Sequence, residues 1–541
     1  MSHVASVSTR PSVKANASTV DAYSLATFCA IAIPSLALRI ALSPQVSGLD
    51  DTGYLQAAQV VSQGHSLDTL FGLFRLRVGM AYPLGLAMRH GWLHPDQFWL
   101  LTVAAEAITL TALFVAARNL VSISAGLVAT LLYGMYPIAV QQTTLYMPTA
   151  FQVAAISVAV ALLSLAVQSR SATLGAAMGA GGGVALGLGY LVKEDVALIV
   201  PVLALAALLS RFARLRHVVW MCVGAAAVFF GECLVYWYTT GNPLFRLTVT
   251  SGLGAPPADL AITDIWAWNA YIRSLFVLPA QVGLFWWAAI PALWFSLRSS
   301  DRSARFAGGA LVLAFCYLQF GSGSFTEFSP LPKTPRYTAI ATPFLILALA
   351  VWLADQFDRV PRTAVTVLTA LTLVSVPCIF LLHISASERM RNTVAVLPVL
   401  RDHEPSRIYT DYYSARLLTL LLPSRVNVVP WYHADFKNNR MLVRATPEGD
   451  SGAYVLFDRQ ASKIYTSSYE MKLPDEVTQM RREWVPVWSS RAYAEGSVPR
   501  TVLSIIGSVA ERWPRLPMSA RVANNIRDMI DADEATLYRI P

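Results

Sequence analysis

Two adjacent carboxylates, Asp50 and Asp51, are the side chains of this sequence best placed to do chemistry. They lie in the stretch SGLDDTGYLQAAQVVSQG, residues 47–64, shortly after the first long apolar run. Apolar residues recur after them with the i, i+3, i+4, i+7 spacing that predicts a short amphipathic helix, namely Tyr54, Ala57, Ala58 and Val61. Two interpretations stay open. Acids at a helix N-terminus can simply bind free backbone N–H groups, or one of them can act as a general base.

Basic side chains that could face these acids occur beside the ends of predicted membrane spans. Lys193 opens the triplet Lys-Glu-Asp, and Lys333 and Arg336 belong to KTPRY. A cation at the end of a span is often only an interfacial anchor, but arginine also suits bidentate phosphate contact. We therefore take as candidate phosphate ligands Arg77, Lys193, Lys333 and Arg336. The candidate substrate contacts are Tyr54, Tyr82, Glu194 and Tyr337.

Composition defines the class of protein that carries these residues. Of the 541 residues, 55% are hydrophobic and 14% are charged, against about 25% charged residues in an ordinary soluble domain. The chain is therefore predicted to be a polytopic membrane protein. Its net charge of +9 does not indicate nucleic acid, because many arginines lie in short loops between apolar runs, where they set orientation. The five cysteines lie in apolar runs and predict no disulfide framework or metal site.

About eleven apolar runs approach the roughly 20 residues that a membrane helix needs. They fall at about 23–42, 97–117, 121–140, 149–167, 173–192, 196–210, 218–238, 275–297, 306–320, 337–354 and 364–383. Alternate loops are rich in arginine, and the positive-inside rule makes those loops cytoplasmic. The opposite face then collects the acids, the candidate cations and the end of the chain. Arg39, near the outer end of the first run, is expected to extend to the interface.

Three regions are expected along the chain. Residues 1–22 would be a cytoplasmic tail, residues 23–385 an all-α membrane domain with loop helices at about 48–95, and residues 386–541 a small α/β domain outside the cytoplasm. RIYTDYYSARLLTLLLP reads as a strand turning into a helix, and RVNVVPW, GAYVLFD and ATLYRIP read as strands. His433 and Asp435 are too few for a metal site. The sequence has no phosphate-binding P-loop, HExxH or GxSxG motif.

This arrangement has a chemical logic. Sugar transfer from a lipid phosphate needs a carboxylate to take the acceptor proton, cations to neutralise the leaving phosphate and a groove for the prenyl chain. The acids at positions 50 and 51 could supply the first requirement. Lys193, and Lys333 with Arg336, could supply the second.

The order of elements resembles the GT-C superfamily of integral-membrane glycosyltransferases. The most similar branch is that of protein O-mannosyltransferases and lipid A aminoarabinose transferases. The matching pieces are GLDDTGYLQAAQVVSQG, RLRVGMAYPLGLAMRHGW, GLGYLVKEDVALIVPVLAL, KTPRYTAIATPFLILAL and IYTDYYSARLLTLLL. They cover most of the chain in order, and the acidic pair and the PRY element are the most specific of them.

The resemblance implies roles for individual residues. Asp50 matches the catalytic aspartate of the family, Asp51 its acidic neighbour, and Lys193 and Arg336 match positions associated with the donor phosphate. The implied activity is inverting transfer of a sugar from a polyprenyl-phosphate carrier to a lipid, glycan or protein acceptor on the periplasmic side of a bacterial inner membrane. No cofactor is expected. The chain departs from the family at LYMPTAFQ, which has no carboxylate where many relatives have one.

Two other classes of function remain as alternatives. A transporter or flippase of lipid-linked substrates would use intramembrane acids, here Glu106 and Glu232, to line a pathway. A transporter should place its key charges near the membrane midplane, whereas most charges here fall on one face. The absent acid in LYMPTAFQ instead favours an inactive envelope scaffold.

Overall fold

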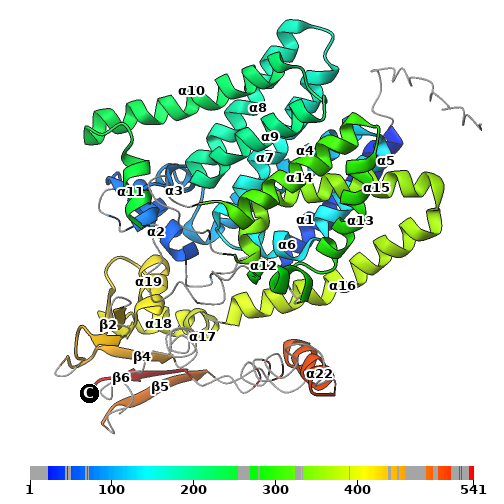
Figure 1. Cartoon of the computed structure of the whole chain (residues 1–541). Helices are drawn as coiled ribbons and strands as arrows, with labels where there is room; N and C mark the ends of the chain where they lie inside the picture. Colours follow the sequence, from blue (N-terminus) through cyan, green and yellow to red (C-terminus); the bar gives the residue numbers. More distant parts are fainter. Residues whose placement is uncertain are drawn as a thin grey trace, which may run out of the picture.

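A computed structural model defines most of the chain, and its elements are shown in Figure 1. The structure describes residues 22–42, 46, 50–67, 70, 72–253, 269–277, 281–322, 331, 333–388, 390–435, 440–447, 450–458, 483–490, 498–512, 523, 526, 530 and 535–541. The expected tail at 1–22 therefore lies almost wholly outside the described residues, as does Glu327 in the loop before KTPRY.

Twelve helices build the membrane domain of the described chain. They are α1 (Ala22–Leu42), α4 (Trp99–Leu120), α5 (Ile123–Gly134), α6 (Pro137–Thr144), α7 (Pro148–Gln168), α8 (Ala172–Val192), α9 (Ile199–Leu209), α10 (Leu215–Thr240), α13 (Phe285–Arg298), α14 (Arg302–Phe320), α15 (Thr342–Arg359) and α16 (Pro361–Glu388). Each of the eleven predicted runs contains a helix. The prediction of an all-α polytopic membrane protein with a small C-terminal α/β domain is confirmed.

The described residues contain eight helices long and apolar enough to cross a membrane, or nine if a bent pair counts as one span. That pair is α5 and α6, which meet at 61°. The prediction of about eleven spans therefore includes two helices that fall short of this length, α9 with 11 residues and α13 with 14. The first residues of the predicted run at 196–210 belong to a 3-10 turn, Glu194–Leu198, and α9 begins only after it.

Glycines set the close packing of α8 against α10. A Cβ on Gly183 would lie 1.9 Å from the carbonyl oxygen of Met221, and one on Gly224 would lie 2.1 Å from that of Ala180. Small residues allow such approach between membrane helices, so α8 and α10 pack closely against each other. Lys193 follows the C-terminal end of α8.

Short segments cover one end of the bundle (Figure 1). They are α2 (Asp50–Ser62), η2 (Gly72–Arg75), α3 (Val78–Arg89), η3 (Pro95–Gln97), η4 (Glu194–Leu198), α11 (Phe245–Leu253), α12 (Ala270–Ile272), the π-helix η6 (Arg273–Val277) and η7 (Pro335–Ala341). The predicted amphipathic helix is confirmed as α2, and its apolar stripe is buried: Tyr54, Ala57, Ala58 and Val61 are all at most 5% exposed.

The C-terminal region forms a six-stranded mixed sheet in the order β3-β2-β1-β4-β6-β5. Its elements are α17 (Arg391–Ala395), α18 (Leu397–His403), β1 (Arg407–Asp411), α19 (Tyr412–Leu421), β2 (Asn427–Asp435), β3 (Arg440–Val443), β4 (Tyr454–Asp458), β5 (Val485–Ser490), α22 (Val498–Arg512) and β6 (Ala535–Arg539). β1 pairs in parallel with β2 and β4, and the other pairs are antiparallel.

The strand predictions are confirmed as β1, β2, β4 and β6, and the predicted helix is α19. β3 and β5 were not predicted. His433 and Asp435 lie in β2, but their side chains are outside the described part of the structure.

Helix α19 joins the sheet to the helices around Asp50. The Nε of Arg416 donates to Oε1 of Gln56 at 3.0 Å, and Leu420 packs in one cluster with Tyr54 and Leu55. Figure 1 shows α19 directly beneath α2, with the sheet below it. The C-terminal domain therefore supports the helix that carries the acidic pair.

Candidate active site

Six of the candidate residues from distant parts of the chain line one cavity of about 340 Å³. They are Asp50, Tyr54, Arg77, Lys193, Arg336 and Tyr337, and the remaining lining residues are Leu73, Phe74, Met147, Pro148 and Thr149. The cavity thus combines one acid, three cations, two tyrosines and several apolar side chains. Such a set can bind a group that is anionic at one end and apolar at the other.

Asp50 and Arg336 are in contact with each other on the wall of this cavity. Nη1 of Arg336 lies 3.4 Å from Oδ2 of Asp50, and the two side chains are 42% and 47% exposed. Asp50 begins α2, and Arg336 is the second residue of η7, which Pro335 opens. A partly solvated pair at this distance is weak, so an anionic ligand can compete for the guanidinium.

Lys193 and Arg336 share one aromatic ring. The Lys193 ammonium lies 4.4 Å from the centre of the Tyr337 ring, and the Arg336 guanidinium carbon lies 5.3 Å from it. Lys193 is the C-cap of α8 and has an extended backbone. Tyr337 therefore gathers two cations from different helices by cation–π contact.

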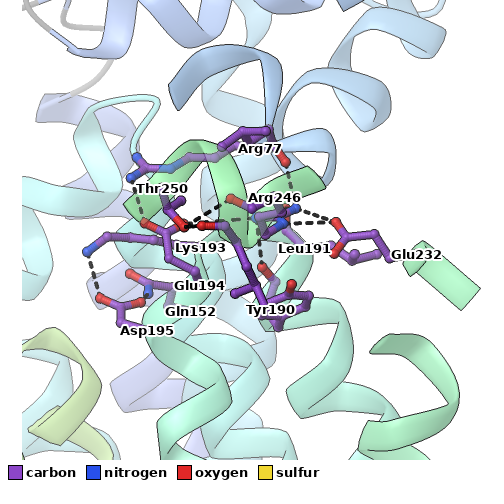
Figure 2. Close-up of polar contacts among 12 residues, drawn as sticks. Arg77, Gln152, Tyr190, Leu191, Lys193, Glu194, Asp195, Glu232, Arg246 and Thr250 are labelled. Atoms are coloured by element: carbon purple, nitrogen blue, oxygen red, sulfur yellow. Dashed lines mark hydrogen bonds and ion pairs between the residues drawn. The ribbon is translucent and has the colours of Figure 1, made fainter. Parts of the chain in front are cut away.

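Ion pairs hold Glu194 and Asp195, the two acids of the Lys-Glu-Asp triplet (Figure 2). Nζ of Lys193 lies 2.7 Å from Oδ2 of Asp195, whose other oxygen accepts a hydrogen bond from Gln152. Glu194 lies 3.5 Å from Nη2 of Arg77. Burial raises the pKa of Glu194, but Arg77 and Lys193 outweigh this and hold it below its ordinary value of 4.5.

Four candidate residues do not line the cavity. Asp51 is fully buried in the first turn of α2, and Lys333 is 2% exposed just before η7. Tyr82 is 46% exposed on α3, away from the face of that helix that packs inward. Glu194 stands behind Arg77 rather than on the cavity wall.

Sequence reasoning missed several residues of the site. Gln152 and Asp195 pair with each other behind Lys193, and Met147, Pro148 and Thr149 form the wall at the start of α7. The sequence signal lies in LYMPTAFQ. Its glutamine is the residue that reaches the Lys-Glu-Asp triplet. Among the described residues, no group of three His, Cys, Asp or Glu side chains is placed to hold a metal ion.

The two intramembrane acids each have an arginine partner. Glu106 lies 2.6 Å from Nη2 of Arg39, and both side chains are fully buried. The expectation that Arg39 extends to the interface is therefore wrong, because it turns into the bundle and also donates to Ser35 and Gly134. Glu232 lies 2.6 Å from Nη2 of Arg246. Neither acid lines the cavity, so a pathway built on them loses support.

Comparisons with known proteins agree with this architecture. Residues 94–237 match the family model of dolichyl-phosphate-mannose-protein mannosyltransferase. No curated protein sequence matches the chain.

Solved structures align over most of the chain. ArnT from Cupriavidus metallidurans bound to undecaprenyl phosphate is 15% identical, with a TM-score of 0.52 over 83% of this chain and 95% of that one. The Archaeoglobus fulgidus oligosaccharyltransferase AglB, in complex with an inhibitory peptide and a dolichol-phosphate, is 11% identical, with a TM-score of 0.52 over 96% of this chain and 88% of that one.

The chain has the fold of the GT-C superfamily of membrane glycosyltransferases. It resembles the branch of protein O-mannosyltransferases and ArnT, as its sequence predicts.

Proposed function

We propose that this protein is an inverting glycosyltransferase that moves a sugar from a polyprenyl-phosphate carrier to a lipid, glycan or protein acceptor. The observation that carries the proposal is the cavity in which Asp50 faces Arg336 while Lys193 stands beside the same tyrosine ring. An acid and two cations from three separate elements meet there. The solved neighbours hold undecaprenyl phosphate and dolichol-phosphate, which supports a donor of the same chemical class.

Lys193, Arg336 and Arg77 bind the donor phosphate in this proposal. All three line the cavity, and each has a carboxylate within 4 Å: Asp195, Asp50 and Glu194 respectively. Arginine binds phosphate in bidentate geometry, so the donor phosphate can replace a partly solvated carboxylate as its partner. The bound cations also stabilise the negative charge that develops on the leaving phosphate.

Asp50 is the general base. It takes the proton of the acceptor hydroxyl while the hydroxyl oxygen attacks the anomeric carbon and the bond from that carbon to the phosphate oxygen breaks. The products are the glycosylated acceptor, polyprenyl phosphate and a protonated Asp50. Attack from the face opposite the leaving group inverts the configuration at the anomeric carbon.

The remaining candidates act around this centre. Tyr54 and Tyr337 line the cavity and contact the sugar, while buried Asp51 orients the start of α2. Glu194 holds Arg77 in place. Lys333 and Tyr82 lie off the cavity wall and stay candidates only for contacts with the rest of the donor or the membrane.

In this proposal the cavity and residues 386–541 lie on the periplasmic side of a bacterial inner membrane. The support is the alternation of arginine-rich loops, together with the position of α2 and the sheet at one end of the bundle (Figure 1). A phosphatase fused after Pro541 should then be active, and a cytoplasmic fluorescent reporter there should stay dark. The opposite pattern would overturn this orientation.

Mass spectrometry of envelope glycolipids and glycoproteins tests the activity. Cells that lack the protein should lose one sugar from one acceptor, and the wild-type gene should restore it. An unchanged set of glycoforms would reject the proposal. The mass of the missing sugar would identify the donor class and the acceptor together.

A further inference from the structure

Arg246 is a buried charge that the proposed mechanism does not use. It lies at the start of α11, is 1% exposed and does not line the cavity. Figure 1 shows α11 leading from the end of α10 towards α2 and α3. Moving an ion out of water costs several kcal/mol unless it is paired and hydrogen-bonded. The partners of Arg246 therefore indicate its role.

The guanidinium of Arg246 is shared between one acid and three backbone carbonyls (Figure 2). Nε and Nη2 donate to Oε1 of Glu232 at 2.9 and 2.6 Å. Nη2 also donates to the carbonyl of Leu76 at 2.5 Å, and other bonds reach the carbonyls of Tyr190 and Leu191 at 3.4 Å. Glu232 thus balances the positive charge of Arg246, and the three carbonyls accept further hydrogen bonds from its guanidinium.

These carbonyls belong to the two segments that present cations to the cavity. Leu76 immediately precedes Arg77, and Leu191 is two residues before Lys193. Arg246 also lies 3.9 Å from Glu194, which contacts Arg77. One side chain therefore connects the loop before α3 to the C-terminal end of α8. Only arginine has five donors in a planar fork, so a lysine at this position could not make the same set of contacts.

We propose that Arg246 is a positioning residue of the phosphate site: it fixes the spacing between Arg77 and Lys193 without touching the ligand. This inference rests on the proposed function, because it assumes that these two cations bind the donor phosphate. A misplacement of about 1 Å can reduce a rate by about 100-fold. Loss of these contacts should therefore move Arg77 and Lys193 in the cavity, although Arg246 itself lies outside the cavity.

The test measures the affinity of the purified full-length protein for undecaprenyl phosphate, used as the probe, beside its melting temperature. Arg246→Lys keeps the charge but removes the fork, and we expect affinity to fall by about tenfold or more. Arg39→Lys is the matched control, because Arg39 is also a fully buried arginine paired with a glutamate at 2.6 Å, and it donates hydrogen bonds to Ser35 and Gly134, which do not line the cavity. It should lower the melting temperature similarly and leave affinity unchanged.

A double-mutant cycle separates positioning from general destabilisation. If Arg246 acts through the two cations, Arg246→Lys should have little further effect on affinity in a protein that already carries Arg77→Ala and Lys193→Ala. Additive losses would overturn the inference, as would a loss of affinity in Arg39→Lys equal to that in Arg246→Lys.

A second variant covers the case in which Arg246→Lys does not fold. Replacing Arg246 by Met together with Glu232 by Leu removes the ion pair as a unit, which buried sites often tolerate. This folded variant should show the same loss of affinity, and normal affinity would overturn the inference. If Arg77→Ala and Lys193→Ala left affinity unchanged in the wild-type background, the proposed function would fail instead, so the two failures are distinguishable.

Discussion

Arg336 lies 3.4 Å from Asp50 although 286 positions separate the two residues in the chain. Asp50 begins a helix that lies across the end of the bundle. Arg336 is the second residue of Pro335–Arg359, the most deeply buried candidate span in the described part of the chain. The contact places the proposed base and a proposed phosphate ligand on the same small surface. It also implies a link between donor binding and the state of the base. A donor phosphate that binds the Arg336 guanidinium would release the Asp50 carboxylate from its ion pair.

The first prediction concerns the two cations around Tyr337. Arg336→Ala and Lys193→Ala should each reduce sugar transfer by about 100-fold, since a charge-assisted contact with the donor phosphate contributes a few kcal/mol. Transfer per amount of inserted protein is the quantity to measure. Arg359→Ala is the control, because Arg359 is exposed and pairs with Asp355 of its own helix. Near-normal transfer in both cavity variants would leave these residues as interfacial anchors.

Tyr337 gives a second prediction that separates its ring from its hydroxyl. Tyr337→Phe keeps the aromatic face that both cations contact, whereas Tyr337→Leu removes it. A cation–π contact contributes about 0.5–2 kcal/mol. The Leu variant should therefore bind undecaprenyl phosphate several-fold more weakly than the Phe variant. Equal affinities of the two variants would show that the ring does not place the cations.

The third prediction uses a buried acid of the C-terminal domain. Asp411 ends β1 and caps α19, accepting hydrogen bonds from the backbone N–H groups of Tyr413 and Ser414 at 2.8 and 3.1 Å. Burial raises its pKa above the ordinary value of 3.8. Between these two pKa values the folded state binds more protons than the unfolded state, so stability decreases as pH rises.

Asp411→Asn tests this because asparagine also caps helices but does not titrate. The free energy of unfolding of the wild type, relative to that of Asp411→Asn, should decrease as pH rises above about 4 and then stay constant once the native carboxyl is ionised. Thermal unfolding at a series of pH values measures it. A difference that increases with pH would mean that the ionised carboxylate is favoured in the folded state.

How far the sequence predicted this site depends on the kind of residue. Asp50 is identifiable as one of two adjacent acids that begin a predicted amphipathic helix. Lys193 and Arg336 are identifiable because each stands at an end of an apolar run, and alternating arginine-rich loops put these ends on one side. Tyr82 does not line the cavity: the inward face of α3 carries Met80, Ala81 and Leu84, and Tyr82 is off that stripe. The helical period of this segment predicts that orientation.

Other features were not readable from sequence for physical reasons. Arg246 has three backbone carbonyls among its partners. Every residue has a backbone carbonyl, so the amino-acid sequence does not identify such partners. Lys333 lies in an irregular segment before η7, so no period gives the direction of its side chain. The short length of α9 depended on a 3-10 turn that hydropathy alone does not reveal.

The two acids of α2 should differ in effect. Asp50 lines the cavity, whereas Asp51 is fully buried beside it. Asp51→Asn should therefore reduce the rate of transfer without abolishing it, with a loss of protein stability as the second readout. If Asp51→Asn abolished transfer while Asp50→Asn only slowed it, the two roles would have to be exchanged.

The most direct test of the account is the amount of sugar transferred by Asp50→Asn, measured by mass spectrometry of the acceptor in cells that lack the wild-type protein. Asparagine keeps the size of the side chain and removes the base. The account predicts no detectable transfer by a variant that is inserted normally and still binds undecaprenyl phosphate. Transfer at the wild-type level by Asp50→Asn would contradict the assignment of Asp50 as the base and of this cavity as the active site.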